Sequence, residues 1–203
     1  MEKKLGGLPM IVFTAVCALA GLLLRTAQRG GGSPAALIAV SAAVALALLA
    51  ASLFFEKKRE FAQVFGKNIA DAAVSGVGAL LLLLGCALSA WKNTGAGRYI
   101  GILGVVAALG LVRAAALRYG GAKPSAALHV PAILFYVAKL FYDYRHWKVD
   151  PTILDYCVLL LAMLCFMQAA YHTAAFCFDR GDRRALVFFS AAGVYFGAVS
   201  LPG

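Results

Sequence analysis

Residues 34–55 read PAALIAVSAAVALALLAASLFF, a run of 22 residues without a charged side chain. A helix needs about 20 predominantly apolar residues to cross the hydrocarbon core of a bilayer, so this run is long enough. Apolar residues fill the run continuously and do not alternate with polar ones, which argues against the strands of a membrane β-barrel. The stretch therefore predicts a membrane-spanning helix.

Six further stretches of this kind occur along the chain. Together they predict an all-α polytopic membrane protein in which a bundle of seven transmembrane helices forms one domain over residues 1–203. The predicted spans are residues 8–24, 34–55, 69–90, 98–117, 125–142, 152–177 and 185–201. The first span follows a basic start, as a signal peptide would. We interpret it as an uncleaved helix, because its leucines continue to Leu24 and a second span follows.

The composition of the whole chain agrees with membrane insertion. Among its 203 residues, 63% are of the types AVILMFWYC and 14% are charged, whereas a soluble domain is nearer half apolar and a quarter charged. Too few polar side chains are present to cover a water-facing surface. This excludes an ordinary soluble enzyme, a disordered tail and a secreted disulfide scaffold, and it predicts a multi-pass protein of the cell membrane.

The distribution of basic residues predicts an orientation. Seven crossings place the termini on opposite sides; the N-terminal side carries twelve of the nineteen Lys and Arg residues and the other side, which includes Arg25, carries seven. Because cytoplasmic loops are enriched in Lys and Arg, the N-terminus is predicted to be cytoplasmic and the C-terminus outside. The net charge of +10 is dispersed among helix ends, which favours membrane lipid and not nucleic acid as a partner.

The two parts of the chain differ in composition. Residues 129–203 hold 15 of the 23 aromatic residues and all three histidines, whereas residues 1–128 are rich in Ala, Leu and Gly. This division predicts scaffold helices in the first part and recognition in the second.

The fifth predicted span carries a stripe of polar residues. His129, Tyr136 and Asp143 are seven residues apart and share one helix face, and Lys139 is placed to pair with Asp143. Charged residues inside a membrane span are functional candidates. The stripe predicts either the lining of a substrate or proton path, or a structural helix-end ion pair beside a core histidine.

The sixth span has a similar set of polar residues. Gln168, His172 and Asp179 are predicted to share a face, with Cys177 nearby. Histidine, cysteine and aspartate resemble metal ligands in type, but their spacing matches no metal motif. We therefore expect a hydrogen-bonded cluster, without a metal ion or other cofactor.

The outer connection between these two spans mixes cations, carboxylates and aromatic rings. It predicts either an outward-facing pocket for a small polar or aromatic ligand or an interfacial aromatic belt. Asp150 and Pro151 there predict a helix start. With the polar stripes, the ligand-binding hypothesis comprises His129, Tyr136, Lys139, Asp143, Arg145, Trp147, Asp155, Tyr156, Gln168 and His172.

Two other patterns concern packing. Glycine and alanine recur at helix-contact spacing at Gly97, Gly101, Gly104 and Ala108, and again at Gly193 and Gly197. These stripes predict helix contacts, either within the bundle or with a second copy of the chain. Residues 56–68 alternate charged residues with Phe and Val and predict a short interfacial helix.

No catalytic signature occurs in the chain: GxSxG, Walker A, GxGxxG and HExxH are all missing. We expect a small-molecule transporter, or the substrate-binding membrane subunit of one, whose site opens to the outside. Its expected partners are lipid, the ligand, and an energising subunit or a second copy. The alternatives are a non-catalytic sensor or assembly protein, and a membrane-embedded enzyme acting on a lipid or isoprenoid through His129, His172, Asp155 or Asp179.

Overall fold

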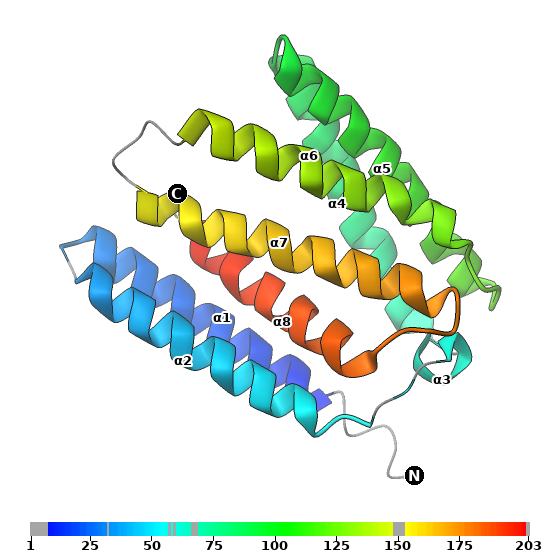
Figure 1. The fold of residues 1–203 in the computed structure, drawn as a ribbon, viewed down its shortest axis with the longest axis horizontal. Helices are drawn as coiled ribbons and strands as arrows, with labels where there is room; N and C mark the ends of the chain where they lie inside the picture. Colours follow the sequence, from blue (N-terminus) through cyan, green and yellow to red (C-terminus); the bar gives the residue numbers. More distant parts are fainter. Residues whose placement is uncertain are drawn as a thin grey trace. The chain divides into compact units, whose positions relative to one another are not determined.

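The computed structural model describes residues 8–31, 33–56, 58, 60–65, 69–147 and 153–201, and these ranges contain helices but no strand (Figure 1). The helices are α1 (Leu8–Arg29), α2 (Pro34–Leu53), α3 (Phe61–Phe65), α4 (Ile69–Lys92), α5 (Ala96–Tyr119), α6 (Val130–Trp147), α7 (Ile153–Phe176) and α8 (Arg183–Ser200), and the short 3-10 helix η2 (Ala126–Leu128) precedes α6.

Six of the described helices are long and apolar enough to cross a membrane. They are α1, α2, α4, α5, α6 with the preceding 3-10 turn, and α7. In the described residues, the all-α fold with apolar helices of membrane-crossing length is therefore as predicted. The seventh predicted span also forms a helix, α8, but it is not among these six. Its 18 residues open with Arg183 and Arg184, which lower the mean hydropathy of the helix.

The boundaries of α1 correct one prediction. The first span was expected to end at Leu24, with Arg25 in the following loop, whereas α1 continues to Arg29. Arg25 is 2% exposed, and its guanidinium donates to the side-chain oxygen of Gln28, one turn further along the helix. A charged side chain can thus lie inside this helix because a neighbouring polar side chain accepts its hydrogen bond.

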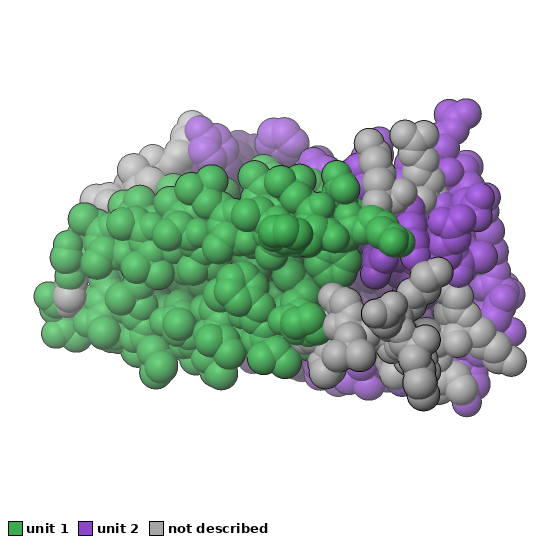
Figure 2. All heavy atoms as spheres, turned by 90° about the horizontal axis from the view of Figure 1, so that it is seen from below, with its two compact units in different colours: residues 1–56, 147–166, 184–203 green, residues 57–146, 167–183 purple. Residues whose placement is uncertain are grey.

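The chain divides into two compact units, coloured separately in Figure 2. Unit 1 contains residues 1–56, 147–166 and 184–203, and unit 2 contains residues 57–146 and 167–183. Helix α7 contributes its first part to unit 1 and its second part to unit 2. The compositional division at residue 128 is a separate property of the chain and stays a prediction.

In unit 1, α8 packs against three other helices. A side chain at Gly21 of α1 would meet Val199 and Tyr195 at 2.6 and 2.7 Å. The Tyr195 hydroxyl lies 3.1 Å from Ser41 Oγ of α2, and the ring of Phe166 from α7 lies against Gly193. The second part of α8 is therefore mostly buried, with Tyr195 fully buried, whereas Val194 is exposed.

In unit 2, α4 and α5 form a closely packed antiparallel pair. Gly101 of α5 faces Ala90 of α4, and further along α5 Gly104 faces Cys86. A Cβ atom at residue 101 would lie 2.6 Å from the backbone nitrogen of Ala90, so glycine permits this approach. Phe135 of α6 also packs against Gly104 and joins the same core. The glycine stripes predicted from the sequence thus make contacts inside each unit.

Candidate functional site

The ten residues of the ligand-binding hypothesis fall in both units. Unit 1 contains Trp147, Asp155 and Tyr156. The side chains of Trp147 and Asp155 and the predicted helix start at Asp150 and Pro151 lie outside the described residues. The other seven belong to unit 2: His129, Tyr136, Lys139, Asp143, Arg145, Gln168 and His172.

Lys139 and Asp143 of α6 are joined directly. Lys139 Nζ lies 2.6 Å from each carboxylate oxygen of Asp143. The two residues are four apart, which places them on one face of the helix. Asp143 is 3% exposed, whereas about a third of the Lys139 side chain (35%) is exposed. The pair therefore has a buried carboxylate and an accessible ammonium group.

The ring of Tyr142 lies beside the ammonium group of this pair. Lys139 Nζ lies 5.9 Å from the centre of the Tyr142 ring, within the range of a cation–π contact. The Tyr142 hydroxyl packs against Gly97 near the start of α5, where an added Cβ atom would lie 3.1 Å away. Arg145, which the sequence placed in a connection, lies on the exposed surface of α6. Arg145 is two residues beyond Asp143 and so lies on a different face of the helix from the pair, which leaves Lys139 and Tyr142 together.

His129 is the other buried polar residue of this set. It caps the 3-10 turn before α6 and is 2% exposed. Its Nδ1 atom is buried and has no hydrogen-bond partner among the described residues. Buried polar atoms in native proteins are nearly always paired, so an unpaired one requires a physical explanation.

Tyr136, Gln168 and His172 are half-buried, and the ring of His172 packs edge-on against Tyr171 at 5.4 Å between centres. The predicted shared face of Gln168, His172 and Asp179 is wrong. Helix α7 ends at Phe176, and Asp179 has a φ of 55°, so the chain has already left the helix. Asp179 accordingly makes contacts elsewhere.

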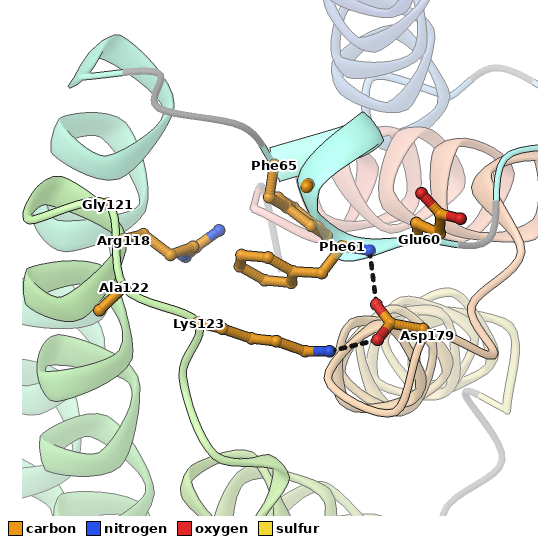
Figure 3. Close-up of a pocket in the computed structure, with 9 residues that line it drawn as sticks. Glu60, Phe61, Phe65, Arg118, Gly121, Ala122, Lys123 and Asp179 are labelled. Carbon is orange, nitrogen blue, oxygen red and sulfur yellow. Dashed lines mark hydrogen bonds and ion pairs between the residues drawn. The ribbon is translucent and has the colours of Figure 1, made fainter.

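The structure places Asp179 at a cavity that the sequence did not predict. The cavity has a volume of about 560 Å³, and we call it the α3 cavity. All of its lining residues belong to unit 2, from three segments of the chain (Figure 3). They are Glu60, Phe61, Ala62, Phe65, Arg118, Gly121, Ala122, Lys123 and Asp179.

Asp179 connects these three segments. One carboxylate oxygen accepts the backbone N–H of Phe61 at 3.0 Å, and the other accepts from Lys123 Nζ at 2.6 Å. The hydrogen bond from Lys123, followed by that from Phe61, lowers the pKa of the Asp179 carboxyl below its ordinary value. Asp179 is therefore ionised at neutral pH and orders the start of α3 and the turn after α5.

Aromatic side chains form the apolar wall of the α3 cavity. Phe61 is buried, and its ring centre lies 5.3 Å from that of Phe65. Phe65 makes an edge contact with Phe176 at 5.5 Å. The Arg118 guanidinium lies over the Phe65 ring, 5.3 Å from its centre, and donates to Ser75 Oγ at 3.0 Å. Within residues 56–68 a short helix does form, α3, with five residues; its interfacial position stays a prediction.

Metal-ligand geometry is missing in the described part of the chain, where no group of three His, Cys, Asp or Glu residues could hold an ion. Burial also raises the pKa of the Cys177 thiol, which disfavours the thiolate that binds metals.

In comparisons with known proteins, the chain matches no protein-family model, no curated protein and no solved structure.

Proposed function

We propose that the chain is a multi-pass protein of the cell membrane that binds a small polar ligand at the end of α6. It transports this ligand or delivers it to an energising subunit. The observation that carries the proposal is the Lys139–Asp143 pair, whose carboxylate is buried within a helix that is long and apolar enough to cross a membrane.

In this proposal the membrane is crossed seven times, with α8 as the last crossing. At about 1.5 Å per residue, the 18 residues of α8 extend about 27 Å, close to the hydrocarbon thickness of about 30 Å. Arg183 and Arg184 then lie at the cytoplasmic end of α8.

The energetics of the Lys139–Asp143 pair favour a role beyond stability. The Asp143 carboxylate has left water, and its attraction to a partly exposed ammonium offsets only part of the cost of that burial. The order of the two residues is also unfavourable. A carboxylate near a helix C-terminus opposes the helix dipole, and an acidic residue preceding a basic one stabilises a helix better. If the pair only stabilised α6, we would expect the acidic residue at position 139 and the basic residue at position 143.

The same geometry suggests what the ligand looks like. The exposed part of the Lys139 ammonium would attract a carboxylate or another anionic group. The Tyr142 ring beside the ammonium offers a stacking surface for an aromatic or apolar part of the ligand. The ligand that fits is therefore a small molecule with an anionic or carbonyl group and a planar part.

A ligand screen tests this proposal. The melting temperature of the purified full-length protein is measured in detergent with vitamins, nucleosides, amino acids and other small carboxylates. A ligand at 100 times its dissociation constant stabilises a protein by about 2.7 kcal/mol, which is enough to shift the transition. The shift should disappear in Lys139→Gln, which removes the ammonium group, and persist in Tyr144→Phe, a control at an exposed position of α6. A shift retained in Lys139→Gln would contradict the proposed site.

The glycine stripes do not favour the assembly-protein alternative, because the described glycines of both stripes pack inside the chain. Gly101 faces Ala90, and Gly193 faces Phe166. A second copy of the chain would need a different surface.

A further inference from the structure

The α3 cavity lies far from the Lys139–Asp143 pair. Tyr142, next to Asp143, packs on Gly97 at the beginning of α5, whereas Arg118 of the cavity lies at the end of α5. Twenty-one residues of helix separate these two positions on α5, a rise of about 32 Å. The cavity is therefore a second location, independent of the proposed ligand site on α6.

In the proposed membrane arrangement, the α3 cavity lies at the ends of the crossing helices. Arg118 is the second-last residue of the crossing helix α5, and Phe176, which supports the aromatic wall, is the last residue of α7. Apolar helix surface thus ends at the cavity, and the chain turns polar there. Cationic side chains at such a boundary meet anionic groups of the interface.

The polar lining of the α3 cavity contains two basic residues, Arg118 and Lys123, and two acidic residues, Glu60 and Asp179. Both oxygens of Asp179 are already occupied, by Lys123 and by the Phe61 N–H. The Lys123 ammonium has three donors, and the bond to Asp179 uses one of them. Glu60 accepts from Gln63 at 2.6 Å, and its carboxylate lies on the far side of Phe61 from Arg118 (Figure 3).

The opposite side of the cavity is aromatic. Phe61 and Phe65 project toward Arg118 and Lys123, so that ring surface and cations face the same space (Figure 3). A volume of about 560 Å³ lies within the usual range of about 300–1,000 Å³ for small-molecule sites. The cavity accordingly suits a molecule with one anionic end and one apolar or aromatic body.

We propose that the α3 cavity binds a phosphate group carried on an apolar or aromatic body, with Lys123 and Arg118 contacting the phosphate and Phe61 and Phe65 contacting the body. Phosphate is favoured over a carboxylate because its additional oxygens can accept from an ammonium and a guanidinium at the same time. Such a group occurs in an anionic phospholipid and in a soluble organic phosphate.

Binding of matched probes to the purified full-length protein tests this inference and distinguishes the two sources. Dioctanoyl phosphatidic acid is compared with dioctanoylglycerol, and phenyl phosphate with phenol, by titration calorimetry in detergent. Binding of phosphatidic acid, but not of its phosphate-free counterpart, identifies a lipid site. Binding of phenyl phosphate, but not of phenol, identifies a soluble ligand. Equal binding of a probe and its phosphate-free counterpart, or no binding of either phosphate, overturns the inference.

Substitutions that fill the cavity locate the site and leave both partners of the Lys123–Asp179 ion pair in place. Ala122 and Ala62 line the cavity at exposed positions. Ala122→Trp should weaken phosphate binding by at least about tenfold, equivalent to about 1.4 kcal/mol. Ala127→Trp, at an exposed position that does not line the cavity, should bind normally. Should Ala122→Trp fail to fold, Ala62→Trp replaces it. Unchanged affinity in a folded cavity variant would place the phosphate elsewhere and overturn the inference.

Discussion

Asp143 accepts from the Lys139 ammonium through both of its carboxylate oxygens, each 2.6 Å from Nζ, within a single helix. The carboxylate is buried while the ammonium is partly exposed. The carboxylate therefore needs its partner for charge compensation more than the ammonium does. The ammonium could reach water without Asp143, but the carboxylate would remain buried without Lys139.

This asymmetry predicts that single substitutions of Lys139 and Asp143 lower the free energy of unfolding by different amounts. Lys139→Met leaves an unpaired buried carboxylate and should cost about 3–5 kcal/mol, as breaking buried ion pairs does. Asp143→Asn leaves an ammonium on a flexible stem that can extend to the aqueous interface, and it should cost less than about 2 kcal/mol. Chemical unfolding of both variants in detergent micelles measures the difference. Equal losses of unfolding free energy in the two variants would contradict the claim that the buried carboxylate needs its partner more than the ammonium does.

The contact between α4 and α5 predicts that Gly101→Ala destabilises unit 2. The added Cβ atom would lie 2.6 Å from the backbone nitrogen of Ala90 and 2.8 Å from its Cα, and a backbone cannot move aside as a side-chain tip can. Overpacking of this kind costs about 1–3 kcal/mol. Gly85→Ala is the matched control, since nothing lies within 4 Å of its added Cβ. Thermal unfolding should separate the two variants; similar melting temperatures would contradict the close helix contact.

The contacts of Asp179 predict a graded series of substitutions. Asp179→Asn keeps an oxygen for the Phe61 N–H and tolerates the φ of 55°, but loses the ion pair with Lys123. Asp179→Ala loses both contacts and also has to adopt a positive φ. The melting temperature should therefore fall from wild type to Asp179→Asn to Asp179→Ala. An unchanged melting temperature in Asp179→Ala would show that these contacts do not stabilise the loop.

The same carboxyl predicts a pH dependence. Its pKa is lower in the folded protein than in the unfolded chain, so it stabilises the fold above the unfolded pKa and loses this effect as pH falls through the folded pKa. The difference in melting temperature between wild type and Asp179→Asn should be constant above about pH 5 and should decrease below about pH 4. A difference that decreased between neutral pH and pH 5 instead would contradict the lowered pKa.

The proposed seven crossings predict that the C-terminus is outside. Alkaline phosphatase fused after Gly203 should be active, and green fluorescent protein fused there should be dark, because each folds on only one side of the membrane. Fusions after Lys123, in a proposed cytoplasmic connection, should give the opposite result. A fluorescent C-terminal fusion would show that α8 does not cross.

The helices of this chain could be predicted from the sequence because its apolar blocks are long and separated by polar turns. The third span was predicted at residues 69–90, and α4 occupies Ile69–Lys92. Errors arose where a charge was taken as the end of a helix. Arg25 is buried inside α1 because Gln28 accepts its hydrogen bond, a contact that hydropathy does not represent.

The Lys139–Asp143 pair was predictable because it is local, with both residues on one helix face. The α3 cavity was not, because it joins residues near 60, 120 and 179. Its individual segments were visible as an interfacial helix and a polar turn, but the turn's left-handed Asp179 redirects the chain toward Phe61 and Lys123. A helical projection continued beyond Phe176 placed this carboxylate on the wrong face.

The most direct test of the proposed ligand site is calorimetric titration of the screened ligand into wild type and into the double variant Lys139→Asp/Asp143→Lys. The swap restores an i,i+4 ion pair in the order that favours a helix, so the melting temperature should be preserved. The account predicts that binding nevertheless weakens by at least about 100-fold, about 2.7 kcal/mol, because the exposed ammonium has moved. Unchanged affinity in the stable double variant would contradict a ligand site at this pair.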